Sequence, residues 1–154
     1  LLLTLGACAP APEAVEAPDF TLKAMTGENI ILSQYRGKVV LLDVCATWWV
    51  PRMLSIQELV RVQEKYKDRG LIVLGISMDT PSQADDSQIL KFMRTFGINY
   101  PVMRDGGTVS SAYYGDSRAA IPTMHIIDRE GRIIKTIPGF TQGRVPAAVE
   151  EILK

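Results

Sequence analysis

The stretch VVLLDVCATWWVPRM, residues 39–53, places a buried strand directly before a helix. Its first seven residues, 39–45, are apolar except for Asp43, a pattern typical of a central strand that is covered on both faces. Pro51 suits the first turn of the following helix, because no intrahelical hydrogen bond is lost where proline lacks its N–H. Apolar residues at three- and four-residue steps then continue the predicted helix until Gly70.

Outward from this stretch, strand and helix patterns alternate along the chain. Strands are predicted where apolar residues run or alternate between turn residues, and helices where they recur at helical spacing. The other predicted elements are a β-hairpin over 19–33, a strand over 71–78, a helix over 83–96, a short strand over 100–103, a short helix over 108–114, a hairpin over 123–137 and a final helix over 145–153. This order predicts an α/β fold with a mixed sheet flanked by helices.

Length and composition narrow the class of protein. The chain has 154 residues, enough for one domain with a substantial core. Lys and Arg together number 17, as do Asp and Glu, so the formal net charge is zero and no nucleic-acid partner is predicted. Cys8 and Cys45 are the two cysteines, and His125 is the one histidine. We therefore expect no disulfide scaffold, no metal site and no cofactor.

The first residues, LLLTLGAC, are typical of the end of a secretion signal, with small residues before a cleavage point. The ending LGAC, residues 5–8, resembles the lipobox of bacterial lipoproteins, in which Cys8 would become the lipidated first residue of the mature chain. The alternative is an ordinary secretion signal in which this cysteine is incidental. We predict a signal remnant over 1–7, a disordered tether over 8–18 that is rich in Ala, Pro and Glu, and a folded domain over 19–154. Both interpretations export the protein, and the first anchors it in the bacterial cell envelope, facing the periplasm or the exterior.

Several motifs together resemble one family. They are APDFTL at 17–22, LSQYRGKVVLLDV at 32–44, ATW at 46–48 and IPTMHIIDREGRI at 121–133. With the long helical segment between them, they are similar to the exported thioredoxin-fold thiol–disulfide oxidoreductases of the TlpA/ResA group. The resemblance covers roughly residues 18–154. It implies a thioredoxin-like mixed sheet flanked by helices, with an N-terminal β-hairpin.

The resemblance also implies a reaction centre that this chain does not carry. The family uses a C-x-x-C pair at a helix N-terminus, where the helix dipole favours a thiolate that attacks a disulfide. Those two positions are occupied by Trp49 and Arg52, although Trp48 and Pro51 match the surrounding pattern. No catalytic residue is therefore predicted to be intact.

Cys45 and Asp43 are the residues near this position whose side chains can ionise or react. Cys45 lies at the end of the predicted strand, away from the helix dipole, so we expect a small core residue with a normal or raised thiol pKa. It also lies outside the first helical turn, where peroxiredoxins, a family related in fold, place their attacking cysteine. Asp43 matches a buried acid that exchanges a proton with the second cysteine in thioredoxins. Here we expect it to be neutral or to pair with a cation such as Arg52, if that side chain turns inward.

Pro122 marks a second feature of the resemblance. In the family the peptide bond before this proline is cis, and the adjacent backbone pairs with an extended substrate peptide. Ile121 and Thr123 match on either side. The alternative is that Pro122 only fixes the entry into a strand. For His125 we expect a core residue with one hydrogen bond.

Three functions compete. The one the sequence favours is a redox-silent module that binds an extended peptide or an envelope protein. An alternative is a thiol–disulfide oxidoreductase, in envelope redox homeostasis or cytochrome c maturation, acting through Cys45 or a mixed disulfide. A third is an anion site at the helix N-terminus with Arg52. For the first, Trp49 is expected to be exposed beside Pro122, and the predicted binding residues are Trp48, Trp49, Pro51, Arg52, Ile121, Pro122 and Thr123.

Overall fold

The computed structural model describes residues 13–47, 52–114 and 121–154. In these ranges the chain forms one six-stranded mixed sheet in the order β1-β8-β7-β4-β5-β6, together with a separate hairpin of β2 and β3. The strands are β1 (Val15–Glu16), β2 (Thr21–Lys23), β3 (Asn29–Ile31), β4 (Val39–Cys45), β5 (Leu71–Ser77), β6 (Val102–Arg104), β7 (Thr123–Ile127) and β8 (Arg132–Pro138). The α-helices are α1 (Arg52–Tyr66), α2 (Asp86–Thr95), α3 (Thr108–Tyr114) and α4 (Arg144–Leu153), with 3₁₀ turns at Leu32–Tyr35 and Lys67–Arg69.

Strand β4 is the centre of the sheet. It pairs in parallel with β5 along all its residues, and it pairs antiparallel with β7 on its other side. Each of its seven residues is buried, because both faces of the strand are covered. The predicted central strand over 39–45 is confirmed with the same bounds.

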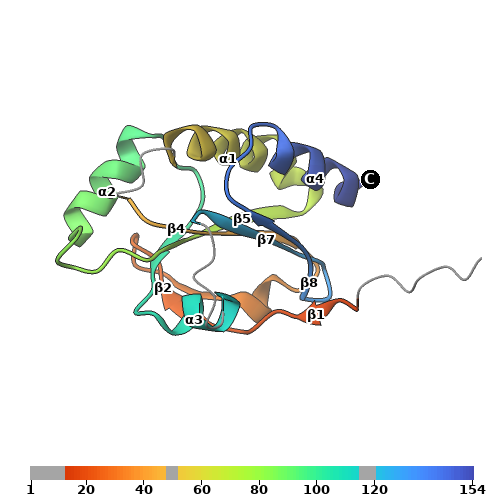
Figure 1. Cartoon of the computed structure of the whole chain (residues 1–154), viewed down its shortest axis with the longest axis horizontal. Helices are drawn as coiled ribbons and strands as arrows, with labels where there is room; N and C mark the ends of the chain where they lie inside the picture. Colours follow the sequence, from red (N-terminus) through yellow and green to blue (C-terminus); the bar gives the residue numbers. More distant parts are fainter. Residues whose placement is uncertain (1–12, 48–51, 115–120) are drawn as a thin grey trace, which may run out of the picture.

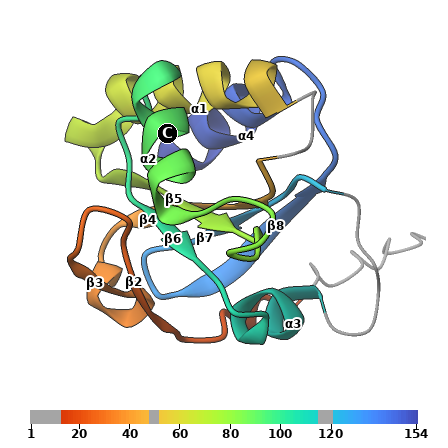
Figure 2. The ribbon, with the colours of Figure 1, turned by 90° about the vertical axis from the view of Figure 1, so that its left-hand side faces the viewer.

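Two hydrophobic cores lie on opposite faces of this sheet. On one face, Leu41 of β4 packs with α1 and α4, which contribute Leu59 and Val149. On the other face, Leu42 packs with the β2–β3 hairpin and with Val109 of α3. Figure 1 shows the resulting layers, with α1, α2 and α4 above the sheet and α3 and the hairpin below it, and Figure 2 shows the same layers from the side. The predicted α/β fold with a mixed sheet and an N-terminal hairpin is confirmed.

Local sequence explains where two of the helices end or begin. Gly70 follows the 3₁₀ turn after α1 with φ +84°, a left-handed conformation that glycine adopts without steric cost. Asp85 and Gln88 form a capping box at the start of α2, each side chain accepting a hydrogen bond from the other's backbone N–H. This cap sets the start of α2 at Asp86, three residues later than the sequence pattern predicted.

The N-terminal part of the domain differs from the prediction. Within the predicted tether, Val15 and Glu16 form β1, which pairs antiparallel with Ile133 and Arg132 of β8. Ala17 is buried. The expected disorder therefore does not extend through 15–17, because the backbone there completes the edge of the sheet. The predicted lipidation site, Cys8, lies outside the described residues.

Within the described ranges, every helix is too short or too polar to cross a membrane.

Candidate functional site

The candidate site lies where β4 ends, α1 begins and β7 begins. Val44 of β4 is in register with Thr123 of β7, so the end of β4 lies level with the Ile121–Pro122 segment. The Ile121–Pro122 peptide bond is cis. Predictions for Trp48, Trp49 and Pro51 concern residues outside the described ranges. The described part of the site therefore consists of the two strand ends and the first turn of α1.

The Arg52 side chain is directed inward. It is only 4% exposed although it stands in the first residue of α1, and its guanidinium carbon lies 5.0 Å from the centre of the Phe92 ring of α2. Such a stack of a cation on an aromatic face is attractive, the more so where water is excluded. The prediction that Arg52 is a binding residue is therefore wrong, and the alternative of an anion site at the helix N-terminus does not fit this buried side chain. The helix and the sheet enclose it instead.

Arg52 is electrostatically coupled to Asp43, which is 1% exposed. Burial raises the pKa of the Asp43 carboxyl, and the positive charge of Arg52 limits that rise. Burial alone lowers the pKa of Arg52, but the nearby Cys45 and Asp43 raise it above the ordinary value, so the guanidinium stays charged. The expected inward turn of Arg52 is confirmed by its burial, and its charge acts on Asp43, the acid that we expected to be neutral or paired.

The coupling does not involve a close ion pair. Among the described residues no salt bridge within 4.0 Å joins the two side chains, and Asp43 Oδ1 and Arg52 Nε and Nη1 lack hydrogen-bond partners. Burial is the larger effect on the pKa of Asp43, and the attraction of Arg52 offsets it only in part. Removing one of the two side chains leaves the other buried and uncompensated.

Cys45 belongs to the core. It is 1% exposed, its sulfur lies 3.7 Å from the carbonyl oxygen of Ile76, and it is the one free cysteine of the described residues. Burial raises its pKa well above the ordinary range, and the negative charge of Asp43 raises it further. The predicted core position is confirmed, and the raised pKa agrees with the expectation of a normal or raised value.

Tyr100 was not anticipated as part of this cluster. It is buried beside the same three residues, and its pKa is raised well above the ordinary value, chiefly by burial and further by Asp43. Phe92, which stacks on Arg52, was not anticipated either. Phe92 and Tyr100 are distant in sequence from Asp43, Cys45 and Arg52, so residue spacing could not predict that they belong to this cluster.

The residues around Pro122 are mostly covered. Pro122 and Thr123 are buried, and the Pro122 carbonyl oxygen accepts a hydrogen bond of 2.8 Å from the N–H of Gly139. Ile121 remains partly exposed. Of the three residues predicted to bind a peptide here, Ile121 is the one with a surface to offer.

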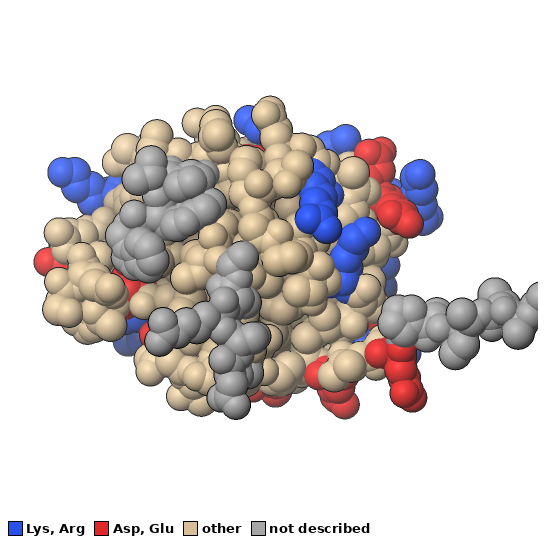
Figure 3. Space-filling view, viewed as in Figure 1, with Lys and Arg blue, Asp and Glu red and all other residues tan. Residues whose placement is uncertain are grey.

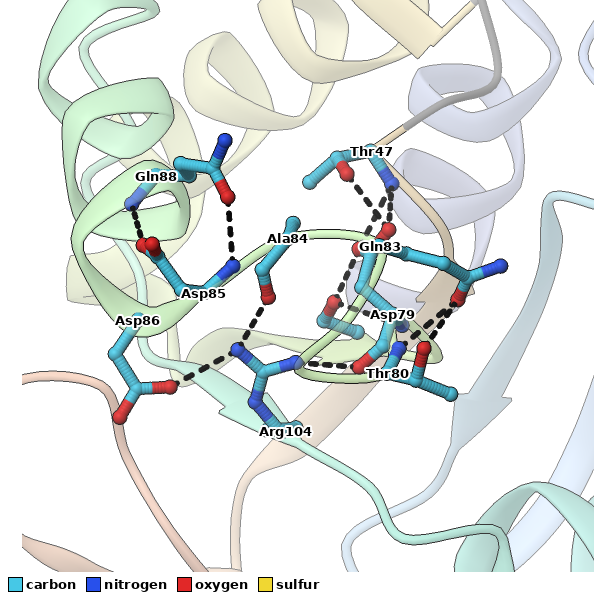
Figure 4. A network of polar contacts seen from close by, with 10 residues as sticks. Thr47, Asp79, Thr80, Gln83, Ala84, Asp85, Asp86, Gln88 and Arg104 are labelled. Atoms are coloured by element: carbon cyan, nitrogen blue, oxygen red, sulfur yellow. Dashed lines mark hydrogen bonds and ion pairs between the residues drawn. The ribbon is translucent and has the colours of Figure 1, made fainter.

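A second polar cluster holds the loop that follows β4. Asp79 is fully buried and accepts hydrogen bonds from the Thr47 N–H, the Thr47 hydroxyl and the Ser77 hydroxyl, at 2.6–3.1 Å. Arg104 donates to the carbonyl oxygens of Asp79 and Ala84 (Figure 4). This network fixes Thr47 at the end of the central strand. The sequence analysis missed it, although an aspartate two residues beyond a buried strand is a usable signal.

His125 is a core residue, as predicted. It is 4% exposed, its Nδ1 lies 3.1 Å from the Thr136 hydroxyl, and burial lowers its pKa. In the part of the chain that the structure describes, no group of three or more His, Cys, Asp and Glu side chains is placed to hold a metal ion.

Comparison with known proteins defines the family. Residues 14–136 match the AhpC/TSA family, so the chain belongs to that family. This assignment concerns the family and does not identify a catalytic residue. Cys45, the one cysteine of the described residues, is enclosed in the core.

Individual relatives agree with the TlpA/ResA resemblance. The thioredoxin-like protein YneN of Bacillus subtilis (strain 168) is 31% identical over 121 residues, which cover 79% of this chain and 68% of YneN. The thiol–disulfide oxidoreductase ResA of Bacillus thuringiensis (strain Al Hakam) is 28% identical over 124 residues, 80% of this chain and 68% of ResA. The crystal structure of a putative thiol:disulfide interchange protein DsbE from Chlorobium tepidum superposes with a TM-score of 0.80 at 28% identity, covering 94% of this chain and all of that one. The chain is thus similar to thioredoxin-fold thiol–disulfide oxidoreductases.

We predict that Asp43 and Arg52 are strongly coupled in stability. Arg52→Met or Asp43→Leu alone should lower the free energy of unfolding by about 3–5 kcal/mol, because each leaves a buried charge uncompensated. The double variant should lie within about 1 kcal/mol of the parent, since apolar side chains of similar volume then fill the site. Urea unfolding of the four proteins at neutral pH measures this. Arg61→Met, an exposed change on the same helix, serves as the control and should cost at most about 0.5 kcal/mol. Additive effects in the cycle would contradict the coupling.

We also predict that Cys45 is inert in the native protein. In a Cys8→Ser background, it should react with a thiol reagent such as Ellman's reagent at least about a hundredfold more slowly than it does in denaturant, because burial disfavours its thiolate. Absorbance at mildly alkaline pH follows the reaction. Native and denatured rates of similar size would refute the core role.

Proposed function

We propose that this protein is a redox-silent member of its family that binds an extended peptide or a partner protein at the degenerate reaction centre. It would use the exposed side chains in the first turn of α1 together with Ile121 as a docking surface, beside the buried end of β4. The chemistry of the C-x-x-C pair is absent from it.

One observation supports this proposal most strongly. By the family resemblance, Arg52 stands at the position of the resolving cysteine, and its side chain is buried, stacked on Phe92 and coupled to Asp43. The positive charge of this arginine offsets part of the effect of burial on Asp43. The acid then has no sulfur with which to exchange a proton.

The described surface next to this position suits a partner. Met53 and Leu54, in the first turn of α1, are 49% and 63% exposed, and Ile121 is partly exposed. Large apolar side chains on a helix tip are costly to leave in water and gain free energy when a partner covers them. These side chains give the docking surface an apolar character.

The alternative, an oxidoreductase working through Cys45, finds little support. A thiol that is 1% exposed, with a raised pKa, neither reaches a protein disulfide nor forms a thiolate readily. The names of the relatives, ResA and DsbE among them, describe thiol–disulfide chemistry, which we infer was present in a common ancestor and lost in this chain.

We further propose that the protein is exported and held at the cell envelope through a lipid on Cys8. The support is the LGAC sequence at residues 5–8 and the Ala-, Pro- and Glu-rich residues that follow it. Mass spectrometry of the mature protein from its own host decides this, and an unmodified N-terminus cut elsewhere would refute it.

Restoring the sulfurs tests the proposed loss of chemistry. We predict that Trp49→Cys with Arg52→Cys forms a disulfide and reduces insulin, whereas the parent does not, because a cysteine at a helix N-terminus has a lowered pKa. The first thiol should titrate below its ordinary value in a pH series of alkylation rates. This variant should also be less stable than the parent, since Asp43 loses its buried cation.

The matched control is Trp49→Ser with Arg52→Ser, which removes the same side chains without adding sulfur and should be inactive. Insulin reduction by the parent would refute redox silence. A folded double-cysteine variant with ordinary, unreactive thiols would refute the placement of residues 49–52 at the family's reaction centre.

A further inference from the structure

The exposed large apolar side chains of the described residues fall into two separate pairs. Met53 and Leu54 belong to the docking surface proposed above. Val15 on β1 and Ile134 on β8 are 67% and 40% exposed. These two strands form the edge of the sheet opposite β6. The proposed function does not account for this second pair.

Val15 and Ile134 border an open hollow of ≈ 380 Å³, which we call the β8-edge hollow. Its lining is Val15, Tyr113, His125, Ile133, Ile134, Lys135 and Thr136. Tyr113 comes from α3, and the other residues come from β1, β7 and β8, so the hollow lies between the small helix and the edge of the sheet. Figure 3 looks onto this side of the molecule, where Lys and Arg side chains lie both right of the middle and at the margins of the view, and acidic groups lie toward the margins.

A β-bulge in β8 exposes the side chain of Ile134 at the β8-edge hollow. The pairing of β7 with β8 shifts register between Ile126 and Ile127, whose partners are Lys135 and Ile133, so Ile134 is an extra residue. A bulge of this kind redirects a side chain and interrupts regular pairing at a sheet edge. β1 pairs with only two residues of β8. The bulge therefore exposes an apolar side chain while discouraging indiscriminate addition of another strand.

The lining of the hollow carries a positive charge and no negative one. Lys135 is the single charged residue of its lining, and no described salt bridge involves it. The nearby ion pairs do not include Lys135: Glu16 pairs with Arg36 at 3.3 Å, and Arg132 pairs with Asp128 at 2.8 Å and with Glu130 at 3.6 Å. An uncompensated ammonium group next to apolar side chains favours a ligand that carries both an apolar group and a carboxylate.

His125 forms the inner wall of the hollow. Its ring lies 5.2 Å from the ring of Tyr113, and its Nε2 is buried without a hydrogen-bond partner. An unpaired buried nitrogen costs free energy unless a neighbouring group moves to satisfy it.

We propose that the β8-edge hollow binds a segment of a partner protein in which an aliphatic or aromatic side chain fills the hollow and an adjacent Asp or Glu meets Lys135. The concave shape suits a single anchoring side chain surrounded by smaller contacts. A membrane surface fits less well, because adsorption to anionic lipid depends on several clustered basic side chains and the hollow has one. The site is distinct from the degenerate reaction centre.

The single histidine of the chain makes a direct test possible. The probe is the peptide acetyl-Asp-Leu-Phe-Asp-amide, titrated into the full chain while the His125 and Tyr113 ring resonances are followed by NMR. These resonances should shift in a saturable manner. The charge-reversed peptide acetyl-Lys-Leu-Phe-Lys-amide should bind about fivefold or more weakly, as should the acidic peptide to Lys135→Glu.

Two surface variants separate this site from the proposed docking surface. Val15→Ser with Ile134→Ser should weaken binding of the acidic peptide about tenfold, because it removes the apolar rim. The matched control, Met53→Ser with Leu54→Ser, should leave it unchanged. An unshifted His125 at millimolar peptide, equal binding of both peptides, or equal effects of the two double variants would overturn the proposal. Stronger shifts with phosphatidylglycerol vesicles, or self-association through the same residues, would overturn it as well. None of these results bears on the redox silence tested with the cysteine variants.

Discussion

The attraction between the buried charges of Arg52 and Asp43 connects the first turn of α1 to the central strand. Each side chain is almost fully enclosed, so each has given up its hydration. The sheet supplies the acid from β4, the helix supplies the cation, and Phe92 of α2 covers the guanidinium. Three elements, β4, α1 and α2, therefore contribute side chains to this one buried cluster at the end of the sheet.

The same interaction explains the chemistry of the site. A cation beside Asp43 limits the rise in the pKa of that acid, and the negative charge of the acid helps to suppress ionisation of Cys45. The arrangement therefore favours charge pairing over thiolate formation. In the same first turn of α1, the apolar side chains of Met53 and Leu54 are exposed.

The sequence predicted the elements well where a single pattern dominated. The strand 39–45 and the helix 108–114 have the predicted bounds, because apolar periodicity and flanking turn residues agreed there. The edge strand at Val15 was missed because two exposed residues after an Ala- and Pro-rich run give no alternation to detect, and only β8 makes them a strand.

The candidate site was only partly predictable. The burial of Asp43 and Cys45 follows from their place in an apolar strand, whereas the inward turn of Arg52 depends on contacts with Phe92 and Asp43 that are distant in sequence. The network around Asp79 and the position of Tyr100 likewise arise from tertiary packing.

The central claim is that Arg52 stands inside the protein as the electrostatic partner of Asp43. Titration of the Asp43 carboxyl carbon by ¹³C NMR, in the parent and in Arg52→Met, tests it most directly. A carboxyl whose folded pKa is raised stabilises the protein below its unfolded pKa, and this contribution is lost as the pH rises toward the folded value. The account predicts a pKa above the ordinary aspartate value in the parent and a further rise in Arg52→Met. An ordinary pKa that the substitution leaves unchanged would contradict it.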